Sequence, residues 1–375
     1  MSGAPQERRE RSRLRSPETA TGVVHEAQAQ RPLLVALRAL GLGDLLTAVP
    51  ALRALAEAFP DHRRVLAAPA ALAPLARLIA AIEEVVDTAP LESLPSSLAH
   101  PEVAVNLHGR GPQSHRRLLA TCPRRLIAFG HPDVAESAGM PHWVEDEHEV
   151  ARWCRMLRES GIPADASRLD LPPSDRPVPR WMRGATIIHP GGKPSCRWPP
   201  ERWAEVARAE HERGRTVLVT GGPGEVELAA EVAHGGRLPP RAVLAARTDL
   251  LDLAALVAAA GRVVCGDTGI AHLATAFGSP SVVLFGPLSP AEWGPPPDRP
   301  WHRALWAGRR GEPHAVVPHQ GLLDIDVGLV LAELDRLPPR SPDPSPPPSA
   351  TAHHDRNVDQ DKGQVDPGQE FSRPS

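Results

Sequence analysis

The sequence of 375 residues contains no tyrosine, and its four cysteines, Cys122, Cys154, Cys196 and Cys265, are scattered without a CxxC pair. This spacing offers no zinc-binding or dithiol motif and is typical of reduced thiols in a cytoplasmic protein. No apolar run reaches the roughly 20 residues that a membrane-spanning helix needs. The N-terminal stretch MSGAPQERRERSRLRSPETA also lacks the apolar core of a secretory signal. We therefore expect a cytoplasmic protein without a transmembrane segment.

An excess of positive charge is also missing. The formal net charge is -3, so no general basic field attracts nucleic acid or an anionic membrane, and we expect no nucleic-acid partner. Hydrophobic residues make up 41% of the chain, which is typical of a globular protein. The length suggests two domains, each able to bury a core.

Composition divides the chain into five segments. Residues 1–30 and 338–375 are polar and aperiodic, and we expect both tails to be disordered. The proline-rich residues 172–182 are expected to link two lobes, an N-terminal one over 31–171 and a C-terminal one over 183–337. Short Val/Leu runs alternate with amphipathic segments in each lobe, which predicts an α/β fold of two parallel sheets. Ligands then bind beyond the carboxyl ends of the strands, in the cleft between the lobes.

The apolar runs predict strands, and the helical spacing between them predicts helices. The expected strands are residues 32–37, 64–67, 103–107, 186–189, 216–220, 262–265 and 281–285. The expected helices are residues 46–59, 70–82, 145–160, 200–211, 225–233, 251–260 and 270–277.

The most informative stretch is VVCGDTGIAHLATAFGSPSVVLFG, residues 263–286. Asp267, Thr268 and Gly269 stand where a strand ends and a helix begins. The glycine lets the backbone approach a ligand, and unpaired N–H groups of the first helical turn attract an anion. His272 follows in the helix, as a site residue or as a buried, satisfied side chain. The same triplet occurs in aspartic proteases, but those need two such aspartates in a β-rich fold, which disfavours that interpretation.

Two further glycine turns follow strands in the second lobe. Gly191 and Gly192 precede Lys193 and Arg197, a combination that can hold a diphosphate, or else forms a solvated turn with incidental charges.

The second turn, TGGPGEVE, carries Glu225 and Glu227. A carboxylate there can accept hydrogen bonds from ribose hydroxyls or simply charge the first turn of a helix.

In the first lobe, Gly41, Gly43 and Asp44 follow the first strand. A carboxylate at this turn can accept a proton from a substrate, or it can cap the helix that follows, and the spacing leaves both roles open. The pattern is not GxGxxG, which weakens a dinucleotide-binding interpretation. Arg110 and Arg116, on a basic loop, either meet an anionic acceptor or form a solvated face.

Taken in order, six motifs resemble glycosyltransferase family 9, the ADP-heptose:lipopolysaccharide heptosyltransferases and their relatives. They are ALRALGLGDLLTAVPALRAL, NLHGRGPQS, HEVARWCRML, HPGG followed by RWPPERWAEVA, VTGGPGEVELA, and CGDTGIAHLATAFGSPSVVLFGP. The resemblance covers roughly residues 32–337. It implies a GT-B fold of two Rossmann-like lobes and inverting, metal-independent transfer of a heptose-like sugar from an ADP-linked donor. The donor is a substrate, so no cofactor is implied.

The resemblance also implies roles for individual residues. Asp44 matches the proposed general base, with Gly43 beside it and with Arg110 and Arg116 on the acceptor side. On the donor side the family's motifs match Gly191, Gly192, Asp267, Thr268, Gly269 and His272, with Glu227 favoured over Glu225 for the ribose. Lys193 and Arg197 join the donor side as the cations after the glycine turn, from the local sequence alone. Family members commonly carry lysine where this chain has Cys196. Either Arg197 or Lys193 then supplies the charge, or the donor is handled differently, so this departure leaves the identity of the donor open.

The implied acceptor is a hydroxyl of a bacterial cell-envelope glycan or glycolipid, and a glycolipid would be met at the inner face of the membrane. Two alternatives stay open. One is a nucleotide-sugar epimerase of the same two-lobed fold, and the other is a catalytically silent protein that binds a sugar nucleotide.

Overall fold

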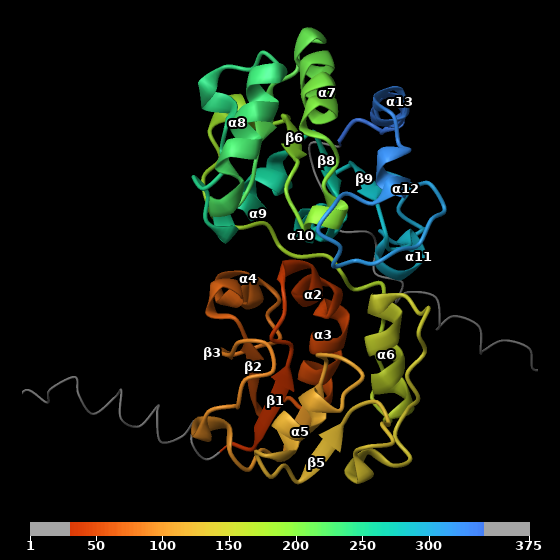
Figure 1. The fold of residues 1–375 in the computed structure, drawn as a ribbon. Helices are drawn as coiled ribbons and strands as arrows, with labels where there is room; N and C mark the ends of the chain where they lie inside the picture. Colours follow the sequence, from red (N-terminus) through yellow and green to blue (C-terminus); the bar gives the residue numbers. More distant parts are fainter. Residues whose placement is uncertain (1–30, 341–375) are drawn as a thin grey trace, which may run out of the picture. The chain divides into compact units, whose positions relative to one another are not determined.

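The computed structural model describes residues 31–340 of the chain. The predicted disordered tails therefore lie outside the described residues, except for residues 338–340. The described part contains two parallel five-stranded sheets, coloured red to yellow and green to blue in Figure 1.

The first sheet has the strand order β3-β2-β1-β4-β5. Its central strands are almost fully buried apolar runs, as expected for a parallel sheet with helices on both faces. The strands are β1 (Leu33–Leu37), β2 (Arg63–Ala68), β3 (Glu84–Asp87), β4 (Val103–Asn106) and β5 (Arg125–Ile127). The helices are α2 (Leu42–Thr47), α3 (Val49–Ala58), α4 (Ala73–Leu78), α5 (Gln113–Leu119) and α6 (Glu149–Glu159).

The second sheet has the order β10-β9-β8-β6-β7. Its strands are β6 (Thr186–His189), β7 (Val217–Val219), β8 (Arg262–Gly266), β9 (Ser281–Phe285) and β10 (His302–Trp306). The helices are α7 (Pro200–Glu212), α8 (Val226–Gly235), α9 (Leu250–Ala259), α10 (Gly269–Ala276), α11 (Pro290–Trp293), α12 (Gln320–Leu323) and α13 (Val327–Arg336). The fold class expected from the sequence, two parallel-sheet α/β lobes, is confirmed.

The predicted helix 46–59 differs from the structure. Two helices occupy this region: α2 begins at Leu42, and α3 begins at Val49 with Pro50 in its first turn. Pro50 has no N–H to donate to the carbonyl of Leu46, and its ring crowds that carbonyl, which explains why α2 does not continue through Ala48. Asp44 consequently lies within a helical turn rather than before the helix.

The C-terminal end of the second lobe extends further than predicted. Arg340, which we expected in the disordered tail, donates hydrogen bonds to the carbonyls of Val257, Ala260 and Phe277 and to Ser279 Oγ. Composition alone hides this anchor, because an arginine in a proline-rich stretch looks like part of a solvated tail.

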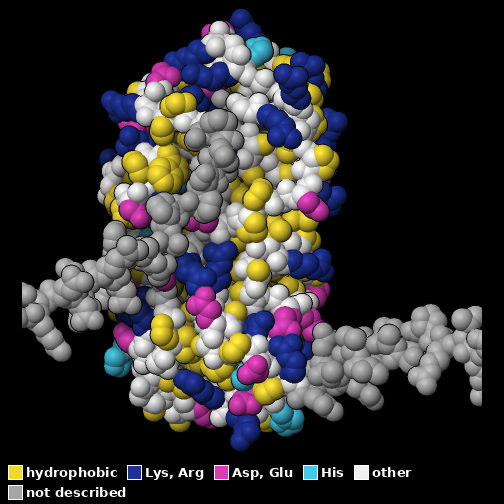
Figure 2. Space-filling model, turned by 180° about the vertical axis from the view of Figure 1, so that it is seen from behind, with side chains coloured by type: hydrophobic (Ala, Val, Ile, Leu, Met, Phe, Trp, Pro, Cys, Tyr) yellow, Lys and Arg dark blue, Asp and Glu magenta, His cyan; other side chains and the backbone are white. Residues whose placement is uncertain are grey.

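One buried apolar cluster runs from the first lobe to the second, including Leu52 and Trp153 on one side and Ile270 and Phe285 on the other. On the face shown in Figure 2, Lys and Arg side chains are scattered among acidic and hydrophobic ones. No helix of residues 31–340 is both long enough and apolar enough to cross a bilayer.

Candidate functional site

Each sheet has a topological switch point, where neighbouring strands lead to connections on opposite sides and leave a crevice at their carboxyl ends. In the first sheet it lies between β1 and β4, and in the second between β6 and β8. Asp44 follows β1, the glycine turn of Gly191 and Gly192 follows β6, and Asp267 follows β8. The strand order therefore places the principal predicted residues where open α/β sheets bind ligands.

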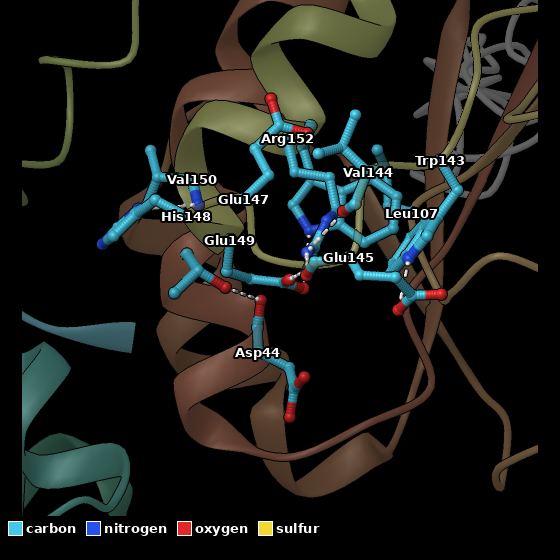
Figure 3. Close-up of polar contacts among 12 residues, drawn as sticks. Asp44, Leu107, Trp143, Val144, Glu145, Glu147, His148, Glu149, Val150 and Arg152 are labelled. Carbon is cyan, nitrogen blue, oxygen red and sulfur yellow. Dashed lines mark hydrogen bonds and ion pairs between the residues drawn. The ribbon is translucent and has the colours of Figure 1, made fainter. Parts of the chain in front are cut away.

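Asp44 is the third residue of α2, and its carboxylate is 27% exposed. Its Oδ2 accepts a hydrogen bond from Gly41 N at 3.1 Å, and its Oδ1 lies 3.3 Å from Arg38 Nη2. Asp44 therefore does cap its helix, which is one of the two roles that the sequence left open. The side chain nevertheless stays partly exposed, and in Figure 3 the Asp44 carboxylate points away from the other labelled residues, so capping does not prevent it from meeting a substrate.

Sequence reasoning missed the arginine behind Asp44. The Arg38 side chain is only 1% exposed, and its guanidinium also pairs with Glu149 at 2.9 Å. Burial by itself raises the pKa of Glu149, but the charges of Arg38 and Arg152 together with hydrogen bonds hold it below its usual range. A charged residue directly after a wholly apolar strand was the available signal, because such a side chain is rarely buried without a partner.

Two glycines let α2 and α10 pack with their first turns in contact (Figure 1). A Cβ on Gly43 would lie 2.8 Å from His272 Cδ2, and a Cβ on Gly269 would lie 2.8 Å from Leu42 Cβ. Real Cβ atoms do not approach so closely, so larger residues would force the helices apart. Burial lowers the pKa of His272 to about 4, which leaves its imidazole neutral at physiological pH. The structure thus brings together Gly43, His272 and Gly269.

Asp267, which directly precedes the Thr268–Gly269 start of α10, interacts electrostatically with Asp44. Burial is the main reason why the pKa of Asp267 rises to about 7, with Lys193 opposing the rise and Asp44 and Glu292 adding to it. The carboxylates of Asp44 and Asp267 are therefore close enough for one to disfavour ionisation of the other. Asp267 therefore keeps its proton to higher pH than an ordinary aspartate.

The glycine turn after β6 lies against the DTG segment. Gly192 has φ of +129°, and a Cβ on it would lie 2.8 Å from Thr268 Cγ2. Glu225 fixes the turn, since its Oε1 accepts from Gly192 N at 2.8 Å and its Oε2 accepts from Gly222 N at 2.7 Å. Burial raises the pKa of Glu225, but these amide hydrogen bonds and the nearby His189 and Arg197 lower it overall. The turn therefore needs both its glycine and this carboxylate.

Glu227, the residue favoured for a ribose contact, lies exposed in the first turn of α8. The structure thus brings Glu225, and not Glu227, to the glycine turn. The missed signal is the carboxylate three residues after Gly222, a spacing that allows it to reach back to that residue's N–H.

The cations near the turn differ in role. Arg197 Nε donates to Gly192 O at 2.8 Å, so this side chain holds the turn itself. Lys193 is exposed and favours the ionised form of Asp267. Cys196 is 6% exposed, and burial raises the pKa of its thiol. Of the two predicted cations, Lys193 is therefore better placed to meet an anion beside Asp267.

The two predicted acceptor-side arginines lie on the surface. Arg110 Nη1 pairs with Glu145 Oε1 at 2.5 Å, and both side chains are more than half exposed. Arg116 Nη2 donates weakly to Asp133 O at 3.4 Å. Within residues 31–340, no group of three or more His, Cys, Asp and Glu side chains is gathered closely enough to hold a metal ion.

Comparison with known proteins gives matches in sequence and in fold. The model of glycosyltransferase family 9 (heptosyltransferase) matches residues 139–313. Lipopolysaccharide heptosyltransferase 2 of Escherichia coli K12 is 33% identical over 215 residues, covering 54% of this chain and 59% of the relative. Lipopolysaccharide heptosyltransferase 3 of Escherichia coli is 31% identical over 157 residues, covering 38% and 44%. The chain thus spans about half the length of these curated relatives.

Solved structures extend the likeness to the whole described fold. A family 9 glycosyltransferase from Veillonella parvula has a TM-score of 0.65 at 19% identity, covering 81% of this chain and 96% of that one. The ADP-heptose lipopolysaccharide heptosyltransferase II of E. coli has a TM-score of 0.62 at 20% identity, covering 81% and 98%. At such identities the likeness shows the two-lobed GT-B fold.

Proposed function

We propose that this chain is a member of glycosyltransferase family 9 and that it transfers a heptose-like sugar from a nucleotide-diphosphate donor to a hydroxyl of a glycan or glycolipid. The donor is ADP-linked, as in the E. coli relatives whose structures contain ADP or an ADP-heptose analogue. The acceptor is a lipopolysaccharide-type glycan, by analogy with the names of the relatives. The protein acts in the cytoplasm, and it works at the inner membrane face where the acceptor is a glycolipid.

The observation that carries the proposal is the contact between α2 and α10. It puts a carboxylate from one lobe, Asp44, beside the Asp267–Gly269 segment of the other, and the effect of Asp44 on the pKa of Asp267 reflects this closeness. A transferase that joins two substrates needs such an arrangement, because each lobe can then present one reactant to the other.

In the proposed reaction, Asp44 accepts the proton of the acceptor hydroxyl as its oxygen attacks the anomeric carbon. The diphosphate leaves from the opposite face, so the anomeric configuration inverts. Unpaired amides in the first turn of α10 and the ammonium of Lys193 stabilise the leaving charge, and no metal ion takes part. General-base assistance of this kind contributes roughly 10²–10⁴-fold to the rate.

The test compares Asp44→Asn with a matched capping variant, Asp252→Asn. Asp252 occupies the same third position in α9 and accepts from Asp249 N at 3.2 Å, so it shares the capping role without the site. ADP release from ADP-heptose is measured with heptose-free lipopolysaccharide as acceptor, and donor affinity is measured separately by calorimetry. Asp44→Asn should lose about 10²–10⁴-fold in turnover with donor Kd nearly unchanged, whereas Asp252→Asn should keep full turnover.

Other outcomes identify the alternatives. Binding of ADP-heptose without turnover in the wild-type protein supports the silent binding protein. A changed sugar in the absence of acceptor supports an epimerase. Tighter binding of UDP- or GDP-sugars than of ADP-sugars overturns the choice of donor.

A further inference from the structure

The Arg38 side chain, beside Asp44, donates hydrogen bonds from all three of its guanidinium nitrogens. Its Nε donates to Asp44 O at 2.9 Å, and its Nη1 donates to Leu107 O. Its Nη2 meets Asp44 Oδ1, Thr47 Oγ1 at 3.2 Å and Glu149 Oε1 at 2.9 Å. One guanidinium therefore ties the backbone and the carboxylate of Asp44 to β4, α2 and α6.

Glu149 is held in turn from the other side. Its Oε2 lies 2.5 Å from Arg152 Nη1, and Trp153 Nε1 donates to its Oε1 at 2.9 Å. Arg152 also donates to the carbonyls of Val144 and Glu145, and Figure 3 shows this set beside Asp44. Glu149 thus has its own cation in Arg152 and does not depend on Arg38 alone.

We propose that Arg38 and Glu149 are positioning residues that set both the direction and the basicity of the Asp44 carboxylate. This inference rests on the proposed function, in which Asp44 is the general base. Nη2 of Arg38 contacts both carboxylates, at 3.3 Å from Asp44 Oδ1 and 2.9 Å from Glu149 Oε1, so Glu149 competes with Asp44 for the same guanidinium nitrogen. The planar fork of arginine also fixes direction, which the single ammonium of a lysine cannot reproduce.

Other charged or titratable groups act on Asp44 from neighbouring elements. His108, after β4, and Asp267, after β8, both interact electrostatically with it. Lys193 acts on Asp267, because its charge lowers the pKa of that carboxyl. These groups are the same in every variant compared below, so differences among the variants report on Arg38 and Glu149.

The test measures the pH dependence of kcat/KM for three variants. Arg38→Met removes the cation behind Asp44, while Glu149 keeps Arg152 and Trp153 as partners. Glu149→Gln keeps an acceptor for Arg38 but removes the competing charge. Glu147→Gln is the control, because Glu147 pairs with Arg155 at 2.8 Å in the same region, away from Arg38.

The two test variants should shift the acid limb of the profile in opposite directions. Arg38→Met should move it to higher pH by about one unit, and Glu149→Gln should move it to lower pH. Both should lower kcat by about 10–100-fold and leave the donor KM within about twofold, since neither residue touches the donor. Arg38→Lys should restore the position of the limb but only part of kcat.

The outcomes separate the two proposals. Unchanged acid limbs in variants that have lost kcat mean a merely structural role and overturn this inference, with the proposed function intact. Absence of wild-type turnover overturns both. Circular dichroism first establishes which variants fold. Because a separate direction of shift is expected for each of the two test variants, either variant alone tests the inference if the other does not fold.

Discussion

The raised pKa of Asp267 makes a quantitative prediction about stability. Its shift from the ordinary value of 3.8 to about 7 means that the folded protein keeps a proton on this carboxyl over a pH range where the unfolded chain has lost it. The folded state therefore binds more protons, and the free energy of unfolding falls as pH rises through that range. Asp267→Asn removes this pH dependence, because an amide resembles the protonated acid and does not titrate.

The magnitude follows from the size of the shift. Between pH 5 and pH 7 a pair of pKa values at 3.8 and about 7 lowers the free energy of unfolding by about 2 kcal/mol. The side chain is only half-buried, so solvent screening reduces this to about 1–2 kcal/mol. The stability of Asp267→Asn relative to the wild-type protein should therefore increase by that amount over the interval, and it should change little above pH 8.

Urea unfolding at several pH values measures the difference directly, because all other titrating groups are common to the two proteins. Asp298→Asn, a substitution of an exposed aspartate on the same lobe, is the control and should show no such trend. A constant difference between Asp267→Asn and wild type from pH 5 to pH 8 would refute the reasoning. When both proteins also carry Asp44→Asn, the pH dependence of their difference in stability should be weaker, because Asp44 contributes to the raised pKa of Asp267.

Two other measurements test the packing. Gly43→Ala should lower the free energy of unfolding by about 1–3 kcal/mol, although alanine normally favours a helix, because its Cβ would overlap His272. Gly109→Ala, whose Cβ meets nothing within 4 Å, should change it by less than about 0.5 kcal/mol, and equal effects in urea unfolding would contradict the helix contact. In the native protein Ellman's reagent should label Cys122, the exposed thiol, while buried thiols such as Cys265, whose pKa is raised, should react only in denaturant. Rapid labelling of a second thiol would show that a buried one is accessible.

The sequence predicted the central strands because each is an apolar run bounded by turn residues. It missed β3, β5 and β10, which lie at or near sheet edges, because an edge strand is covered less and carries polar residues such as Glu84, Asp87, Arg125 and Arg303. Strand order was also beyond local patterns, since it depends on pairing between segments far apart in the chain. The switch points of the two sheets could therefore be found only in the structure.

For the site, local spacing located the turns but not what their side chains contact. It placed Asp44, the Gly191–Gly192 turn and the DTG segment after strands, as the structure has them. It did not reveal that Glu225 binds the amides of Gly192 and Gly222, because that contact depends on how a helix lies relative to a distant strand. The choice of Glu227 for a ribose contact stays a prediction. Arg38 and Glu149 are 111 residues apart in the chain and meet only in the folded protein, where α6 packs against α3.

The side chains of Asp44 and Asp267 have different surroundings. Two carboxylates this close disfavour simultaneous ionisation, so one of them keeps a proton more readily. Asp267 is the one that keeps it, because burial is the largest influence on its pKa and its cation, Lys193, is exposed to water. Asp44 instead has the buried guanidinium of Arg38 behind it and an edge open to solvent. Paired acids in unlike environments can divide into a proton holder and a proton acceptor. In the reaction proposed above, Asp44 would take the hydroxyl proton, and the proton held by Asp267 would reduce its repulsion of the diphosphate.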